Sequence, residues 1–406
     1  MPSQFLDAPI VMQLLTTCKT NGFHISSTEM NGERSDMEDE TDIQTNLMSE
    51  SSASLPSLSS SLLSANDLNN EQVHWAGLYD GHAGDKSSQF LKEQLSASIS
   101  KLKKQDQFDE TKIEMIIRDL DTKFHSIYPT ERSGCTIASA IFSSKRALIF
   151  HVGDSRVVAF NNKTGQILYA TSDHKPTNKD ETARILKAGG FVEDERVCGH
   201  LGLSRAFGDW GYKLNNKLAW DEQLVICKPV FHHISFENQE NQDDIDIVLF
   251  CDGMVEETLT NQNIVDEILH LRQNKTSLVE IARHLPKMAI RDRSSDNISV
   301  ILIHRENEQK DDMPKLTCFT DFIIQKEDLK DLHSLEARHS FIRRGKNVAK
   351  NYLLVNTYFK ACVRENRNSF LRDSDRDSDN DDNYPLYYDS EDDSDSEDGR
   401  RLIVFK

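Results

Sequence analysis

Acidic residues stand at four points where an apolar run of the sequence gives way to a turn. Asp80 and Asp252 are each followed by glycine, Asp296 is followed by asparagine, and Asp154 lies in a Gly-Asp-Ser turn. The ends of strands in one sheet can converge, so these carboxylates can form a cluster, which repels itself unless a cation compensates the charge. Mg²⁺ and Mn²⁺ prefer oxygen ligands, so the pattern predicts a divalent metal site. Any one of these acids alone is better explained as an ordinary turn residue.

The segments around these acids carry strand and helix signals. We predict strands over residues 74–79, 136–142, 147–152, 156–160, 246–251 and 298–304. Apolar residues at helical spacing predict helices over residues 87–102, 111–128, 181–187, 263–271 and 277–290. Strands and helices do not alternate strictly, because hairpins come in blocks and helices come in pairs. We therefore expect an α+β fold with mainly antiparallel pairing, not a doubly wound parallel sheet.

Composition divides the chain into four segments. Residues 1–20 form an N-terminal segment and residues 21–305 hold the candidate catalytic domain. Within it, residues 40–72 are serine-rich and predict a flexible insertion, with a weak helix over 62–68 as the alternative. Residues 306–370 predict a basic helical extension, and residues 371–406 predict an acidic disordered tail.

The net charge of −19 is concentrated in that tail, where residues 373–398 hold 13 acidic residues and one arginine. An acidic chain lacks the basic face of a general nucleic-acid binder. The seven cysteines form no CxxC pair, and no apolar stretch approaches membrane-spanning length. We expect no secretory signal, because residues 1–15 lack a basic region and a long apolar run. We expect an intracellular monomer, cytoplasmic or nuclear, that binds neither nucleic acid nor membrane.

Eight segments together resemble the 2C-type metal-dependent protein phosphatases. In chain order they are GERSDMED (32–39), LYDGHAG (78–84), SGCTIASAIF (133–142), HVGDSRVVAF (151–160), SDHKPTN (172–178), LGLSRAFGDW (201–210), FCDGMVEE (250–257) and SSDNISVILI (294–303). Each segment alone is a weak signal, but the family carries all eight in this order. The resemblance implies a central antiparallel β-sandwich flanked by pairs of helices, followed here by the helical C-terminal extension.

Carried over to this sequence, the resemblance implies a site that holds two Mg²⁺ or Mn²⁺ ions. Asp80 would bridge both ions, and the remaining ligands would be Glu38, the backbone carbonyl of Gly81, Asp252 and Asp296. Arg34 would hold the substrate phosphate, and His82 would act as the general acid. Asp39 would orient water bound to the metals.

The implied reaction is hydrolysis of phosphoserine and phosphothreonine in proteins by a metal-activated water, without a phosphoenzyme. The leaving alkoxide is a strong base, and histidine titrates near physiological pH, so His82 suits the role of proton donor. Two alternatives stay open. The chain could be a pseudophosphatase that binds without turnover, or a metal-dependent phosphatase of small phosphate esters.

Among the departures from the family pattern, two bear on the predicted site. Ala83 replaces a glycine of the usual Asp-Gly-His-Gly-Gly turn, and either adopts a costly positive φ or simply opens the following helix. We expect the second. Glu256 stands where an aspartate is common, and with Asp154 it would form a weaker third metal site whose geometry the longer side chain perturbs.

Overall fold

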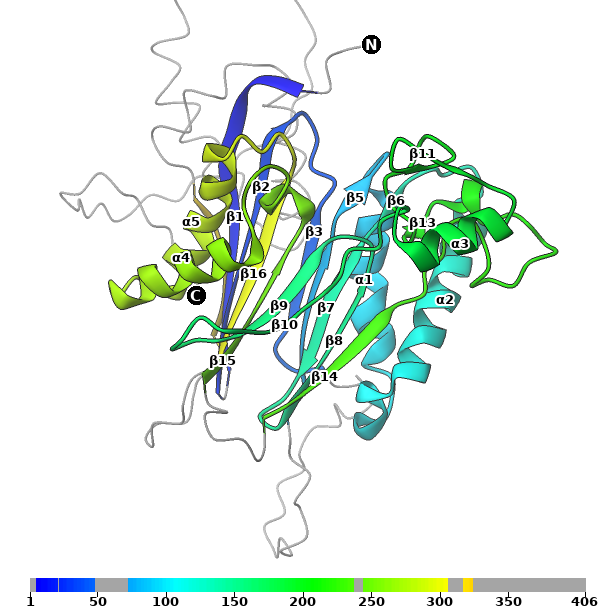
Figure 1. Cartoon of the computed structure of the whole chain (residues 1–406). Helices are drawn as coiled ribbons and strands as arrows, with labels where there is room; N and C mark the ends of the chain where they lie inside the picture. Colours follow the sequence, from blue (N-terminus) through cyan, green and yellow to red (C-terminus); the bar gives the residue numbers. More distant parts are fainter. Residues whose placement is uncertain (1–4, 21, 48–71, 237–243, 306–316, 324–406) are drawn as a thin grey trace, which may run out of the picture. The chain divides into compact units, whose positions relative to one another are not determined.

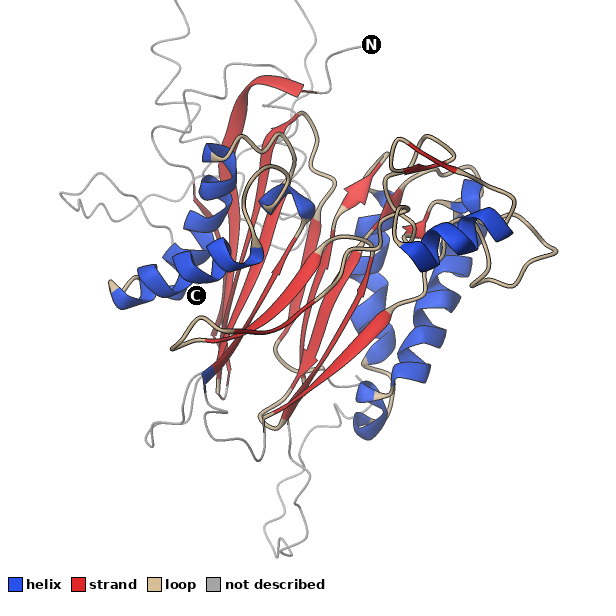
Figure 2. Ribbon diagram, in the orientation of Figure 1, coloured by secondary structure: helices blue, strands red, loops and turns tan. Residues whose placement is uncertain are grey.

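The computed structural model describes residues 5–20, 22–47, 72–236, 244–305 and 317–323. Two antiparallel sheets form its centre (Figures 1 and 2). The 7-stranded sheet has the order β10 (Ile167–Ala170), β9 (Arg156–Asn161), β15 (Ile245–Phe250), β16 (Ile298–Arg305), β2 (Phe23–Arg34), β1 (Phe5–Thr20) and β17 (Thr317–Ile323). The 5-stranded sheet has the order β14 (Val230–Ser235), β8 (Arg146–Val152), β7 (Ile137–Phe142), β4 (His74–Tyr79) and β3 (Glu40–Gln44).

Three hydrophobic cores show that these sheets pack face to face between helices. The middle core joins Ile25 and Leu249 of the first sheet to Leu78 and Ile149 of the second. A second core packs α1 (Lys86–Ile99) and α2 (Glu110–Ile127) on the 5-stranded sheet. A third packs α4 (Asn261–Gln273) and α5 (Leu278–Arg291) on the 7-stranded sheet, as Figure 1 shows. The predicted sandwich flanked by helix pairs is confirmed.

The described residues also form smaller elements: a 3-stranded sheet, a hairpin, the helix α3 and short 3₁₀ turns. A 3-stranded sheet joins β13 (Phe207–Gly208), β6 (Gly134–Cys135) and β5 (Gly81–His82), and a small hairpin joins β11 (Val192–Glu193) to β12 (Arg196–Val197). The helix α3 (Lys179–Lys187) precedes that hairpin, and three short 3₁₀ turns are η2 (Lys104–Phe108), η3 (Trp210–Tyr212) and η5 (Asp252–Met254). In the 3-stranded sheet, β6 lies between the DGHAG turn and residues 207–208 and pairs with both.

The structure adds one strand to the sequence prediction and differs from it at two places. The N-terminal segment contains β1, which pairs with β2. Residues 40–44 form β3, which pairs with β4, so the predicted insertion does not begin at residue 40. The Leu47 amide donates to the Val73 carbonyl at 2.7 Å, which ties together the two ends of the segment between them. Residues 317–323 are strand β17, so the helical prediction is wrong there. The rest of the predicted helical extension, the insertion over residues 48–71 and the acidic tail lie outside the described residues.

The cysteines and the helices bear on two further expectations. Cys18 is disulfide-bonded, and its register partner in β17 is Cys318; disulfides are rare in the intracellular compartments that we expect for this protein. Cys135, Cys198, Cys227 and Cys251 are free. Among the helices of the described segments, none is both long and apolar enough to cross a bilayer.

Candidate metal centre and active site

Buried and partly buried carboxylates gather at one end of the two sheets. Ligand atoms of Asp80, Asp154 and Asp252 all lie within 4.8 Å of one another, and so do those of Asp39, Asp80 and Cys251. Asp80 belongs to both groups, which fits its predicted position between two metal ions. Three of the four predicted strand-end acids therefore converge, whereas Asp296 belongs to neither group.

The strands place these acids because each strand ends one or two residues before its acid. β4 ends at Tyr79, and η5 starts at Asp252, two residues after β15 ends. Close backbone packing fixes the turns: a Cβ on Gly253 would lie 2.1 Å from the Asn297 carbonyl oxygen. Only glycine permits that approach between the turn after β15 and the turn before β16.

Burial and mutual repulsion raise the pKa values of the acids in this cluster. Burial, followed by the negative charges of Asp252, Asp39 and Asp296, raises the pKa of Asp80 well above its usual range. Burial and the charge of Asp154 do the same to the pKa of Asp252. Burial and the charge of Asp296 raise the pKa of Asp39 to about 7. Such groups ionise readily when a divalent cation compensates them, so the donor set fits a hard metal ion.

Asp39 adds a second observation to this fit. Its side chain is buried, and its Oδ2 atom has no hydrogen-bond partner within the described segments. An unpaired buried carboxylate oxygen is costly. Its grouping with Asp80 suits a residue that accepts a hydrogen bond from water at the metal centre.

Glu38 lies on the loop after β2 and is held there by backbone contacts. Its amide donates to Asn297 Oδ1 at 2.8 Å, and its carbonyl accepts from Ser88 Oγ at 2.5 Å. Burial raises the pKa of the Glu38 carboxyl, against a hydrogen bond from the Gly84 backbone. A Cβ on Gly81 would lie 2.4 Å from the Glu38 carbonyl oxygen, so this loop packs directly on the DGHAG turn. Glu38 belongs to neither three-residue group.

Arg34 and Asp296 form an ion pair. Nη2 of Arg34 lies 3.0 Å from Oδ2 of Asp296, and both side chains are about a quarter exposed. Burial raises the pKa of Asp296, while the Arg34 charge opposes that shift. The predicted phosphate-binding arginine thus lies at the edge of the carboxylate cluster, where its charge can act on an anionic ligand.

His82 has a partner that the sequence prediction missed. Its Nε2 lies 2.7 Å from Oδ2 of Asp209, a residue 127 positions further along the chain. Burial alone lowers the pKa of His82, but the Asp209 charge and hydrogen bond outweigh it and raise the pKa. The charges of Asp154 and Glu38 act in the same direction, which places the imidazole beside the carboxylate cluster.

Ala83 adopts the conformation that we expected it to avoid. Its φ is 56°, in the left-handed region, and the following Gly84 has a φ of 126°. The helix α1 begins only at Lys86, with Asp85 as its N-cap residue. The expectation that Ala83 opens this helix is therefore wrong, and the DGHAG turn contains a strained alanine.

The residues expected at a third metal site have other partners. Asp154 forms an ion pair with the Lys175 ammonium. The Glu256 carboxylate accepts hydrogen bonds from the Ser295 amide at 2.8 Å and from the Ser294 and Ser295 hydroxyls. Lys175 belongs to the SDHKPTN segment, but the sequence of that segment does not reveal that its lysine pairs with Asp154. The third site stays a prediction.

Comparison with known proteins identifies the family. The chain matches Protein phosphatase 2C over residues 23–298. A Paramecium tetraurelia protein, "Probable protein phosphatase 2C 4", is 34% identical over 206 residues, which are 47% of this chain and 65% of that protein. The Saccharomyces cerevisiae "Protein phosphatase 2C homolog 2" is 32% identical over 258 residues, which are 59% of this chain and 53% of that protein. The match thus spans between half and two thirds of these relatives.

Solved structures agree on the fold. The crystal structure of a phosphatase from Toxoplasma gondii superposes with a TM-score of 0.61 at 21% identity, covering 76% of this chain and all of that one. Serine-threonine phosphatase 2C from the same organism gives a TM-score of 0.55 at 16% identity, covering 73% and 98%. With the family match extending over more than half of its residues, the chain belongs to the protein phosphatase 2C family.

Proposed function

We propose that the chain is a metal-dependent protein phosphatase that hydrolyses phosphoserine and phosphothreonine in proteins. The observation that carries this proposal is the convergence of Asp80, Asp154 and Asp252, whose carboxylate oxygens lie within 4.8 Å of one another. Family membership supports the same activity. Each acid that the resemblance assigns to the metals is present, which disfavours a pseudophosphatase.

The residues that would hold two Mg²⁺ or Mn²⁺ ions are Glu38, Asp80, the Gly81 carbonyl, Asp252 and Asp296. When bound, these ions lower the pKa of water and offset charge on the phosphoryl group. The raised pKa values of Asp80 and Asp252 support this assignment, because the two carboxylates need a cation to stay ionised together.

The other residues of the site act on the substrate. The planar Arg34 guanidinium can donate two parallel hydrogen bonds to phosphate oxygens. These hydrogen bonds would replace the ion pair of Arg34 with Asp296 when the Asp296 carboxylate binds metal. His82 gives a proton to the leaving serine or threonine oxygen. No thiol nucleophile is required, and burial raises the pKa of Cys135, Cys227 and Cys251 well above the usual range.

The experiment compares Asp80→Asn with wild type for phosphate release from an aryl phosphate and from a phosphothreonine peptide, with Mn²⁺ or Mg²⁺. Asp80→Asn should abolish turnover of both and leave the fold intact. Asp119→Asn is the matched control, because Asp119 is 71% exposed on α2. Turnover that survives Asp80→Asn or chelator would refute the mechanism. Release from the aryl phosphate but not from the peptide would favour small esters as substrates.

A further inference from the structure

The contact between His82 and Asp209 has no function in the site that the eight motifs predict. The carboxylate is almost fully buried, with 5% of its side chain exposed, whereas the imidazole is 27% exposed. The contact uses Nε2, so Nδ1 is the ring nitrogen left to meet a substrate. A buried carboxylate on one nitrogen of a partly exposed imidazole fixes both the ring orientation and the tautomer.

Asp209 is itself held on both sides. It has a φ of 50°, and its amide donates to the Ser133 carbonyl at 3.2 Å. The preceding Gly208 amide donates to Asp121 Oδ1 at 2.7 Å, and the following Trp210 Nε1 donates to the Asp121 carbonyl at 3.0 Å. Asp121 on α2 therefore anchors both neighbours of Asp209.

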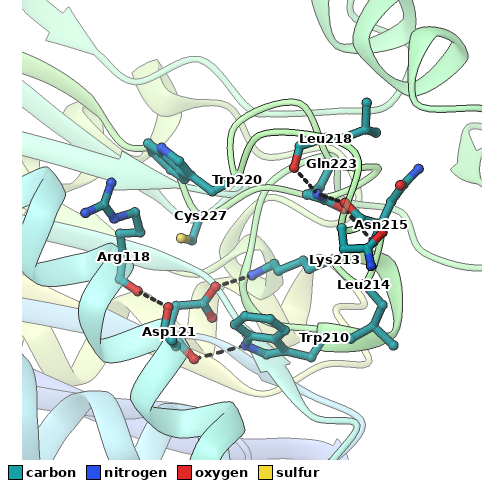
Figure 3. Close-up of a pocket in the computed structure, with 12 residues that line it drawn as sticks. Arg118, Asp121, Trp210, Lys213, Leu214, Asn215, Leu218, Trp220, Gln223 and Cys227 are labelled. Atoms are coloured by element: carbon teal, nitrogen blue, oxygen red, sulfur yellow. Dashed lines mark hydrogen bonds and ion pairs between the residues drawn. The ribbon is translucent and has the colours of Figure 1, made fainter.

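Figure 3 shows this anchor from the side of a pocket of about 350 Å³. Asp121 and Lys213 point toward one another, and the Lys213 ammonium lies 2.8 Å from Asp121 Oδ2. Both side chains are only 5% exposed. A buried ion pair with additional hydrogen bonds is a rigid support, so the turn at Asp209 has little freedom to move.

Gly134 leaves the space in which the two side chains meet. It pairs with His82 on one side and with Gly208 on the other, in the 3-stranded sheet. A Cβ at Gly134 would lie 2.1 Å from Asp209 Oδ2 and 2.5 Å from His82 Nε2. Its φ does not lie in the left-handed region, so the contact, not the backbone conformation, requires glycine here.

We propose that Asp209 is a positioning residue for His82, holding Nε2–H so that Nδ1–H faces the leaving oxygen of the substrate. This inference rests on the proposed phosphatase function. In the step concerned, water replaces the serine or threonine oxygen on phosphorus. The phosphorus–oxygen bond breaks, its electron pair stays on that oxygen, and the oxygen takes the proton from Nδ1. His82 is left as the neutral Nε2–H tautomer, which Asp209 stabilises by accepting its hydrogen bond, until solvent returns the proton.

The test uses two substrates with different needs for a proton. An alkoxide leaving group requires protonation, whereas p-nitrophenolate is a weak base and leaves without it. Asp209→Ala should lower kcat/KM for a phosphothreonine peptide about 100-fold, the order expected when a catalytic group is misplaced. It should lower kcat/KM for p-nitrophenyl phosphate by about tenfold or less. Asp209→Asn should restore much of the peptide activity, because its amide oxygen accepts the same hydrogen bond and asparagine tolerates a positive φ.

A double-mutant cycle separates positioning from a structural effect. If Asp209 acts through His82, adding Asp209→Ala to His82→Ala should cost the peptide reaction almost nothing further. Gly134→Ala is a second variant, which should reproduce the substrate selectivity by pushing the two side chains apart. Additive losses in the cycle, or equal losses on both substrates, would overturn the inference. A wild-type protein that releases phosphate from neither substrate would overturn the proposed function itself.

Discussion

The left-handed alanine in the DGHAG turn predicts that a glycine at this position stabilises the protein. Ala83 has a φ of 56° and an exposed side chain, so removing its methyl group sacrifices no packing. A left-handed conformation costs a non-glycine residue roughly 1–2 kcal/mol. Glycine adds about 0.4–1 kcal/mol of chain entropy to the unfolded state, which offsets part of that gain. Ala83→Gly should therefore raise the free energy of unfolding by about 0.5–1 kcal/mol.

The same substitution inside a helix provides a matched control with the opposite sign. Ala97 is also exposed, but it lies within α1. Glycine there should lower the free energy of unfolding by about 0.5–1 kcal/mol. Urea unfolding in the presence of chelator measures both variants against wild type. The reasoning is refuted if Ala83→Gly destabilises the protein as Ala97→Gly does. Metal-dependent turnover of an aryl phosphate should survive both substitutions.

Three further predictions concern pH, a buried ion pair and metal removal. Burial lowers the pKa of His74 from 6.5 to about 4, against its hydrogen bond to the Thr45 carbonyl. As pH falls below 6.5 only the unfolded chain binds this proton, so the free energy of unfolding falls by about 1.4 kcal/mol per pH unit until pH 4. His74→Asn should remove that part of the slope in urea unfolding between pH 7.5 and 5, and an unchanged slope would contradict it. Asp121→Ala leaves the Lys213 ammonium buried and unpaired, and should cost about 3–5 kcal/mol of stability, partly recovered by adding Lys213→Met. Chelator should lower the melting temperature of the Mn²⁺-loaded wild type but not that of Asp80→Asn, because only the former gains stability from bound metal.

The sequence predicts the elements around the carboxylates well, because their hydrophobic patterns are simple. β4 and β15 are apolar runs that end at Asp-Gly, and the structure has their ends within a residue or two of the predicted positions. The strand β2 carries no such signal. Its residues Ser26, Ser27, Thr28 and Glu29 are polar, yet all are buried. Glu29 is satisfied by the Thr41 amide at 2.8 Å and by the Thr41 hydroxyl. A partner 12 residues away, on another strand, decides this burial, and no local pattern reveals it.

The turn around Ala83 shows a different limit of sequence reasoning. Residue types left two conformations open, and we expected the one that costs alanine nothing. The structure has the other, because Gly81 packs on the Glu38 carbonyl and His82 pairs with Gly134, which together fix the direction of the chain. Local propensity at Ala83 is thus overridden by contacts that residue 83 itself does not make.

The pairing of Asp209 with His82 cannot be predicted from the sequence, because it depends on contacts between distant segments. Asp209 stands in the LGLSRAFGDW segment, so the sequence marks its neighbourhood but gives no reason to pair it with a histidine 127 residues earlier. That pairing depends on the 3-stranded sheet, whose strands are only two residues long and too short for a periodic signal. Asp80 and Asp252, which we propose as metal ligands, come one or two residues after the six-residue strands β4 and β15 and can be inferred from strand ends. The proposed proton donor His82 instead depends on this small sheet and on Asp121 behind it. Substitutions at Gly134, Asp121 and Asp209 should therefore affect proton donation more than metal binding. Metal titration measures the metal affinity of each variant, and kinetics with the phosphothreonine peptide measure the loss of proton donation.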